Sequence, residues 1–460
     1  MRLPSYLLLT IALSGCAGPR PPMPPAALVA APSDWRIGGS PLRGIDRDWW
    51  VQFGDPALDE LVERALAQNV DLMAAGAKIS EARAQFRLSE SHGQPSAGLS
   101  IGGGPTRTIS AFGEGVDQTQ SSAQLSVSYE VDLFGRLSAA TDASRQTLIA
   151  TEFERDATRV ALISTVVTGY VGLRSLDMQL QTTIDTVNSR AAELTVLRRR
   201  SAAGYSSQLD LLQAEAVFEA AARLVPATRL AITKQESALS VLVGDAPGAI
   251  ARGADLEGLG PLEIPHMLPA AVLRQRPDIA EAEAHIVAAD RNLDSARAAF
   301  MPRIQLSANA GGVASTALPS PVSLFSIGSS ILAPLFQGGA LRASADAAAA
   351  RRDQAAFAYR KTALTAFQEV EDALAGVVRN GEERETATRQ VASLRAALDL
   401  ARRRYRAGYS SYLDQLDAER SLLEAQLQLI DLHRKRLASV VALYQSLGGG
   451  WQRSDRYPQS

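Results

Sequence analysis

Three aspartates and one tyrosine lie next to two similar turns of the chain. Asp210 follows the first turn and Asp414 the second, while Tyr405 precedes the second turn and Asp417 closes the group. Carboxylates gathered around an opening attract cations, whereas an aspartate in the first turn of a helix caps its backbone. Asp210 and Asp414 fit both interpretations equally. Asp417 lies beyond the capping turn, which makes it the better candidate for a carboxylate at an opening.

Groups typical of an enzyme or a metal site do not occur in a recognisable pattern. The four histidines are isolated and have no metal-ligand spacing; they are His92, His266, His285 and His433. No nucleophile elbow, phosphate-binding loop or Cys/His cluster is present. With 47 basic and 49 acidic side chains, the charge is nearly balanced, which argues against nucleic acid or another polyanion as a partner. We therefore expect neither an enzyme nor a bound metal.

The only cysteine, Cys16, ends an N-terminal targeting segment with a short basic region and an apolar stretch. Leu13-Ser14-Gly15-Cys16 resembles a bacterial lipobox, in which the cysteine becomes a lipid-modified N-terminus. Ala17 after it resembles the signal for sorting to the outer membrane. We expect a signal peptide at 1–15, a covalent lipid on Cys16 in place of any cofactor, and a lipidated tether within 16–55. An ordinary signal peptide is the alternative.

The chain contains two copies of one pattern. The turns Gly204-Tyr205-Ser206 and Gly408-Tyr409-Ser410 are 204 residues apart, and the same shift relates Glu215 to Glu419. Arginines precede each turn, where they face the negative end of a helix dipole, and the glycine suits a left-handed helix end. Ser-x-x-Asp then resembles a capping box. Each copy therefore predicts a long helical hairpin with this turn at its tip.

The repeat divides the chain into segments of defined type. We expect repeat 1 at 56–244, a linker at 245–268, repeat 2 at 269–448 and a tail at 449–460. The expected helices of the two hairpins are 136–203, 206–244, 340–407 and 410–447, and one further helix is expected from about 56 to 91, before the first hairpin. At 1.5 Å per residue, a helix as long as 136–203 extends roughly 95 to 100 Å. A globular domain of this size does not contain a helix of that length. Apolar residues seven apart, such as Val166, Leu173 and Leu180, indicate that the helices pair as coiled coils.

Four short segments alternate between apolar and polar residues, which is typical of strands with one apolar face. They are centred on residues 96–104, 122–134, 303–311 and 322–333. Four strands cannot close a membrane barrel, whose minimum is about eight, and lipid does not tolerate open edges. Either these strands are not in a membrane, or several copies of the chain combine theirs. Two copies would give eight strands and three would give twelve, and the alternation does not choose between them.

Four motifs together carry a family resemblance. They are Trp49-Trp50-x-x-Phe53-x-Asp55-Pro56-x-Leu58, Asp132-Leu133-Phe134-Gly135-Arg136, Arg276-Pro277-Asp278-Ile279-x-x-Ala282-Glu283 and the paired Gly-Tyr-Ser-Ser turns. The set resembles the outer membrane factors of tripartite efflux systems, the TolC-like family, and most closely its NodT-like lipoprotein branch. The resemblance covers residues 17 to about 450.

The resemblance implies an α+β membrane protein that assembles as a homotrimer. Four strands per chain would complete a 12-stranded outer membrane β-barrel, and the coiled-coil hairpins would form a trimeric α-barrel extending into the periplasm. The segments 16–55 and 245–268 would contribute to an equatorial belt. Such a protein is a lipid-anchored channel in the cell outer membrane of a Gram-negative bacterium. It passively exports small molecules delivered by a periplasmic adaptor protein and an inner-membrane pump, commonly of the resistance-nodulation-division (RND) type.

The resemblance also assigns roles to the tip residues. Asp210, Tyr405, Asp414 and Asp417 would form a periplasmic gate, with the aspartates of three chains around one constriction. The adaptor would dock on Gly204, Tyr205, Ser206, Gly408, Tyr409 and Ser410, because turn chemistry explains the glycines but not two exposed tyrosines. The arginine that pairs with the gate aspartates and the exported substrate both stay open. The alternative function is a lipid-anchored periplasmic coiled-coil scaffold without a pore.

Overall fold

The computed structural model describes residues 19–37, 45–260, 264–265 and 267–453. Cys16 and the lipobox, His266 and the end of the expected tail lie outside these ranges. The chain divides into two compact units. The first consists of Met1–Val29, Ala77–Phe153 and Ala280–Lys361, and the second of Ala30–Gly76, Glu154–Ile279 and Thr362–Ser460. Each unit is described by itself.

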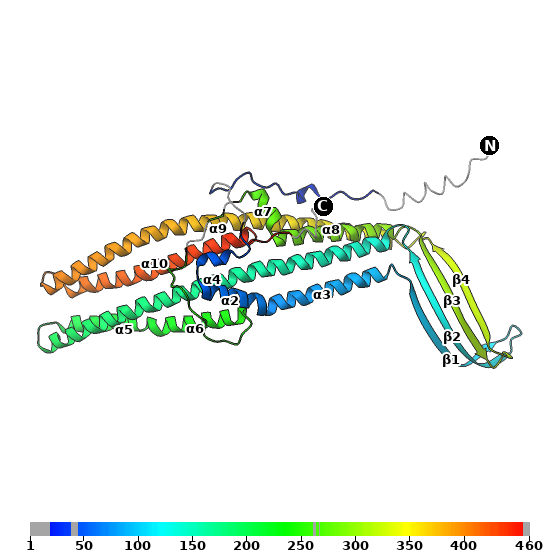
Figure 1. Cartoon of the computed structure of the whole chain (residues 1–460), viewed down its shortest axis with the longest axis horizontal. Helices are drawn as coiled ribbons and strands as arrows, with labels where there is room; N and C mark the ends of the chain where they lie inside the picture. The colour runs from blue at the N-terminus through cyan, green and yellow to red at the C-terminus, as the bar shows by residue number, and fades with distance from the viewer. Residues whose placement is uncertain (1–18, 38–44, 261–263, 266, 454–460) are drawn as a thin grey trace. The chain divides into compact units, whose positions relative to one another are not determined.

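The first unit contains one four-stranded antiparallel sheet in the order β1-β2-β3-β4 (Figure 1). The strands are β1 (Ser96–Ile109), β2 (Gly115–Val131), β3 (Arg303–Ser315) and β4 (Val322–Leu332). The first hairpin is longer than the expected segments 96–104 and 122–134. The reason is its tight turn at 110–114, where Ser110 N–H donates to the Glu114 carbonyl at 2.8 Å and Gly113 takes a positive φ of 83°. Residues 103–109 and 115–121 pair up to that turn, although they do not alternate strictly.

The strand register places apolar and polar residues on opposite faces of this sheet. One cross-strand row reads Leu99, Leu125, Ala310, Phe325, and the next such row on the same face reads Ala97, Val127, Ala308, Ile327. The row between them, on the other face, reads Gly98, Ser126, Asn309, Ser326. Phe325 and Ile327 are 84% and 87% exposed. The sheet therefore has an uncovered apolar face, and β1 and β4 are its edges.

The helices next to the sheet also hold the N-terminal segment in place. This unit contains most of α3 (Val70–Ser91) and α8 (Pro277–Ala298), with parts of α4 (Arg136–Ala202) and α9 (Ala340–Arg406). Arg352 of α9 is 2% exposed and donates to the carbonyls of Pro21 at 2.6 Å and Pro22 at 2.9 Å. Proline carbonyls keep their acceptor capacity, so a guanidinium can bind this segment, which continues into η1 (Pro25–Ala27).

The second unit contains the hairpin tips and a large apolar core. Its elements are η2 (Trp49–Phe53), α2 (Pro56–Gln68), α5 (Gln208–Ala222), α6 (Leu224–Leu242), α7 (Pro269–Gln275) and α10 (Tyr412–Ser446), with the remaining parts of α3, α4, α8 and α9. The Trp49 ring stacks on the Tyr444 ring at 4.8 Å between centroids. Phe53, Leu58 and Tyr170 are fully buried in the same core.

Two of the expected continuous helices are broken. The helix expected at 206–244 is divided at Arg223 into α5 and α6, because Pro226 in the first turn of α6 has no N–H to continue the bonds of α5. The segment 56–91, expected as one helix, is divided at Asn69. The Asn69 side chain accepts from Leu72 N–H at 2.9 Å and donates to the Leu242 carbonyl at 2.9 Å. Asn69 thus caps α3 and fastens it to α6.

Within the described ranges, no helix is both long and apolar enough to cross a bilayer.

Candidate functional site

The two tip turns have the same backbone structure. Gly204 and Gly408 adopt φ values of 75° and 79°. Tyr205 N–H donates to the Arg200 carbonyl at 2.8 Å, and Tyr409 N–H repeats this bond to Arg404 at 2.8 Å. The Tyr205 and Tyr409 side chains are 84% and 78% exposed. Ser206 and Ser410 are half-buried. Both tips thus present an exposed aromatic side chain on a turn of the same structure.

The aspartates near the tips have different surroundings. Ser207 Oγ accepts from Asp210 N–H at 3.0 Å, so the first tip has the expected cap. Ser411 makes no such bond, so the capping box expected in the second tip does not form. Asp414 is exposed, and the exposed Asp417 carboxylate lies 3.7 Å from Arg420. The sequence analysis left the arginine partner of the gate aspartates open, and inside a single chain Asp417 pairs with Arg420.

Tyr405 lies in a small core shared by the two hairpins. Its ring is 5.2 Å from that of Tyr412, which is 3% exposed. Leu194, Leu197, Ala214 and Val217 of the first hairpin pack here with Tyr412 and Leu416 of the second. This core joins the repeats next to their tips, so Tyr405 acts on the hairpin contact through packing.

A buried polar cluster lies beside this core, and the sequence analysis missed it. Its five members are Arg190 and Glu193 of α4, Arg402 of α9, and Gln415 and Glu419 of α10. Arg402 Nη2 donates to Glu419 Oε1 at 3.0 Å, and Gln415 Nε2 donates to the same oxygen at 3.1 Å. Gln415 Nε2 also donates to Glu193 Oε1. Arg190 donates to the carbonyls of Val217 at 2.9 Å and Glu419 at 3.4 Å. The cluster therefore ties α4 and α5 to α10.

Burial changes the acid–base properties of this cluster. Gln415, Arg190 and Glu419 are 2%, 6% and 6% exposed. Burial, together with the charge of Glu419, raises the pKa of the Glu193 carboxyl to about 7. Burial and the nearby carboxylates also raise the pKa of the Tyr412 hydroxyl. Glu193 is thus the carboxyl in this cluster that titrates near neutrality.

The internal repeat contains a signal that could have revealed the cluster. The bond from Arg402 to Glu419 has an exact repeat equivalent, from Arg198 to Glu215 at 3.0 Å, but this second pair is exposed. The other members break the repeat. A shift of 204 residues relates Arg190 to Leu394, Glu193 to Ala397 and Gln415 to Leu211. Polar residues in one copy opposite apolar residues in the other mark the place where the two copies contact each other.

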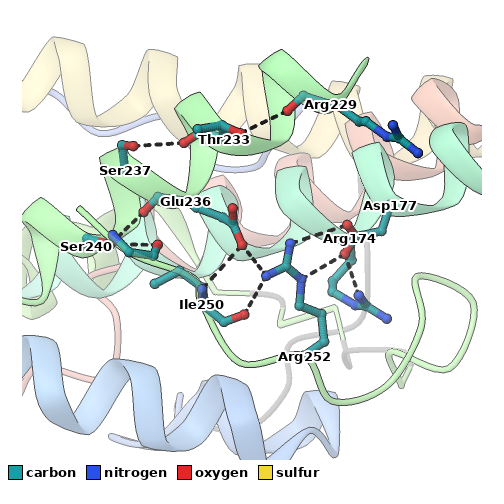
Figure 2. Close-up of polar contacts among 10 residues, drawn as sticks. Arg174, Asp177, Arg229, Thr233, Glu236, Ser237, Ser240, Ile250 and Arg252 are labelled. Carbon is teal, nitrogen blue, oxygen red and sulfur yellow. Dashed lines mark hydrogen bonds and ion pairs between the residues drawn. The ribbon is translucent and has the colours of Figure 1, made fainter. Parts of the chain in front are cut away.

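A second polar site fastens the linker after α6 to the first hairpin (Figure 2). Arg252 donates to Glu236 of α6, and its Nε lies 3.2 Å from Asp177 of α4. Arg174 pairs with Asp177 at 2.6 Å and donates to the Ala254 carbonyl at 2.7 Å. One linker arginine thus bridges two helices, as Figure 2 shows.

The Asp55-Pro56 motif proves to be an anchor for the same linker. Asp55 is fully buried and accepts from Ala57 N–H at 2.9 Å as the N-cap of α2. Its other oxygen accepts from Tyr170 Oη at 2.7 Å and from Ala254 N–H at 3.0 Å. Tyr170 Oη in turn accepts from Gly253 N–H at 3.0 Å. Burial and the bond to Asp55 raise the pKa of the Tyr170 hydroxyl to about 12.

The Arg276-Pro277-Asp278 motif has a similar role in the second repeat. Arg276 is 8% exposed, and its guanidinium binds Asp278 through two nitrogens at 2.7 and 3.0 Å. It also donates to Glu369 of α9 at 2.7 Å and to the Ser446 carbonyl at 2.9 Å. The motif therefore joins the start of α8 to α9 and to the end of α10. Together with the Asp55 site, it shows that the family motifs hold the fold in place.

The hydrogen bonds and ion pairs of these sites join helices and the linker to one another. Over the ranges that the structure describes, no three His, Cys, Asp or Glu side chains are grouped so as to hold a metal ion. An uncovered apolar sheet face and an internally repeated pair of long hairpins point to a channel protein of a membrane.

Comparisons with known proteins identify the family. The model of the outer membrane efflux protein family matches residues 61–245 and 268–449, and the chain belongs to this family. It is 34% identical over 476 residues to the pyoverdine export outer membrane protein OpmQ of Pseudomonas putida, covering 98% of this chain and 99% of that protein. It is also 34% identical over 413 residues to the cation efflux system protein CusC of Escherichia coli, covering 88% of each.

A solved structure supports the same conclusion. The outer-membrane channel OprN has a TM-score of 0.85 and 28% identity to this chain, covering 95% of this chain and all of that one. The comparisons confirm the family resemblance, the mixed helical and four-stranded fold and the function as an outer membrane channel of an efflux system.

Proposed function

We propose that the chain works as a homotrimer whose three sheets form one twelve-stranded barrel. The observation that carries this proposal is the sheet itself, with an uncovered apolar face and two edges, β1 and β4. Open edges are not tolerated in lipid, so each edge needs a strand from another copy. Twelve strands leave an interior wide enough for solutes, whereas eight fill with side chains.

The hairpin tips are the proposed gate and docking surface. Asp210, Asp414 and Asp417 of three chains would place nine carboxylates around the periplasmic opening, and Tyr405 would hold the second hairpin through its packing on Tyr412. The exposed Tyr205 and Tyr409, with the glycines and serines beside them, are the proposed contact with a periplasmic adaptor. The inner-membrane pump, of the resistance-nodulation-division type, would supply the energy, so the channel itself is passive.

The proposed attachment to the outer membrane combines the barrel with a lipid on Cys16, as in the NodT-like branch. Its support is the N-terminal segment directly after the lipobox. Besides the bonds from Arg352, Arg297 donates to the Pro19 carbonyl at 3.1 Å and Arg20 pairs with Asp290 at 2.9 Å. A chain held from residue 19 onwards would keep the lipid close to the folded unit.

Conductance of the purified protein in planar lipid bilayers tests whether it forms a channel. We expect discrete channels from the trimer. A pore-less scaffold, the alternative function, would give none. A Cys16→Ser variant should lose incorporation of labelled lipid and keep part of its conductance, because the barrel is a second anchor. Wild-type protein without the label would contradict the lipid attachment.

A further inference from the structure

One carboxylate of the cluster beside the tips, that of Glu193, forms no ion pair with either of the two arginines. Glu419 lies 3.0 Å from Arg402 and 3.8 Å from Arg190. In the described part of the chain, no arginine or lysine comes within ion-pair distance of Glu193. Glu193 instead shares the amide nitrogen of Gln415 with Glu419. Two ionised carboxylates that share one donor repel each other, whereas one protonated carboxyl can donate to the other.

The cluster lies where the two hairpins must separate if the tip opens. Glu193 is on α4 of the first hairpin, and Gln415 and Glu419 are on α10 of the second. The shared apolar core, which includes Leu194 and Tyr412, adjoins both. Any movement that separates the first hairpin from the second has to break the bonds through Gln415. The cluster thus holds a position between the hairpins that the exposed Asp414 and Asp417 do not.

We propose that Glu193, Gln415 and Glu419 form a proton-dependent latch that holds the first hairpin to the second in the closed channel. Binding of one proton to the Glu193 carboxylate removes the repulsion from Glu419 and supplies an O–H donor to the pair. Loss of that proton leaves the half-buried Glu193 carboxylate and the buried Glu419 carboxylate facing one amide, and this loosens the hairpin contact. The latch rests on the proposed function of the chain as a gated duct.

The charged groups around Glu193 are consistent with a latch that closes when Glu193 is protonated. The charged and titratable side chains facing the cluster are Asp185, Arg190 and Arg200 of α4, Arg402, Tyr405 and Arg406 of α9, and Tyr412, Glu419 and Arg420 of α10. Arg402 favours the ionised form of Glu193, but burial and Glu419 outweigh it and raise the pKa of Glu193 to about 7. A proton has access, because Glu193 lines a groove of about 300 Å³ together with Arg200, Tyr405 and Gln415.

The buried Arg190 side chain gives the cluster room to rearrange. Its Nε has no hydrogen-bond partner in the described structure and lies 3.8 Å from Glu419 Oε2. A buried donor without a partner is costly, so a small shift of Glu419 towards Arg190 is favourable. Such a shift is open to Glu419 when an ionised Glu193 repels it. Glu419 therefore has a second arrangement within reach, in which it binds Arg190 Nε, and a switch requires such a second state.

The test is the pH dependence of channel conductance, with no adaptor present. We expect wild-type conductance to rise about fivefold or more between pH 5.5 and 8.5, with a midpoint near 7. Glu193→Gln mimics the protonated side chain and should stay at the low conductance throughout. Glu215→Gln is the matched control, because Glu215 forms the equivalent but exposed pair with Arg198, and it should keep the wild-type profile.

The possible outcomes distinguish failure of the latch proposal from failure of the proposed channel function. A Glu193→Gln profile equal to that of the wild type overturns the latch, and so does a flat wild-type profile. Protein that gives no channels at any pH contradicts the proposed function instead. Hydrogen exchange of the wild-type tips needs no variant. After correction for intrinsic rates, residues 190–222 should exchange faster at pH 8 than at pH 6, and equal rates also overturn the proposal.

Discussion

Arg402 and Glu419 form an ion pair at 3.0 Å that recurs 204 residues earlier between Arg198 and Glu215, also at 3.0 Å. The chemistry of the two pairs is the same, but Glu419 is 5% exposed at its side chain and Glu215 is 36% exposed. The first hairpin covers Glu419, and nothing in the described chain covers Glu215 to the same extent. One molecule therefore contains the buried and the exposed form of a single interaction.

Removal of the two arginines should have unequal effects on stability. Arg402→Ala leaves a buried carboxylate with Arg190 at 3.8 Å, and we expect it to lower the free energy of unfolding by about 3 kcal/mol. Arg198→Ala removes an exposed pair and should cost about 0.2–1 kcal/mol. Thermal unfolding of the detergent-solubilised variants measures both. Equal losses would show that burial by the first hairpin adds nothing to the pair.

The Asp55 site predicts that one residue of the Asp55-Pro56 motif holds the distant linker in place. Asp55→Ala removes the N-cap of α2 and the acceptor for Tyr170 and Ala254, so we expect a loss of about 2–4 kcal/mol in unfolding free energy. Tyr170→Phe removes only the hydroxyl and should cost about 1–3 kcal/mol, because Gly253 N–H loses its partner. Chemical denaturation compares the variants. A Tyr170→Phe loss as large as that of Asp55→Ala would contradict this division of roles.

The Arg252 site predicts local rather than global loosening. Arg252→Ala should release the segment at 245–260 from α4 and α6, and limited proteolysis should then cut within it several times faster than in the wild type. Arg229→Ala is the control, because Arg229 is an exposed residue on α6 whose side chain is outside the Arg252 network (Figure 2). Arg252→Lys should show most of the effect, since a single ammonium does not reproduce the bonds to both Asp177 and Glu236. Cleavage of Arg252→Ala at the wild-type rate would show that Arg252 does not hold this segment against α4 and α6.

Local patterns in the sequence were sufficient to predict the repeat, the two tip turns and the presence of four strands. Each of these depends on neighbouring residues, such as Gly204 in its turn or alternation along β2. The breaks at Asn69 and Arg223 were missed because the apolar pattern continues through them. The buried cluster was missed for a different reason. Arg190 and Gln415 look like surface residues of separate helices, and only the contact between the two copies makes them neighbours.

The roles of the motif residues could not be predicted for the same reason. Asp55 binds Tyr170, 115 residues away, and Arg276 binds the carbonyl of Ser446, 170 residues away. A capping role for Asp55 follows from the proline after it, but its second oxygen depends entirely on tertiary structure. The motifs that carry the family resemblance therefore singled out these residues, and the structure shows which contacts they make.

His433 should make stability depend on pH in the acid range. It is buried in α10, and burial, with repulsion from Arg384 and Arg436, lowers its pKa to about 4. An unfolded chain has a histidine pKa near 6.5, so between pH 6.5 and 4 the unfolded state binds more protons than the folded state. His433 therefore favours the folded state fully above pH 6.5, and this advantage falls as the pH is lowered, by up to about 3 kcal/mol.

Glu193 acts with the opposite sign, which makes the two groups separable. Its raised pKa means that the folded state binds more protons between about pH 4.5 and 7, so its contribution to stability falls as the pH rises through that window. Denaturation of His433→Leu between pH 4 and 6.5 should show a flatter loss of stability on acidification than the wild type. Glu193→Gln should instead flatten the decline from pH 4.5 to 7. If His433→Leu left the acid limb unchanged, His433 would have to be charged in the folded protein, which its burial beside two arginines opposes.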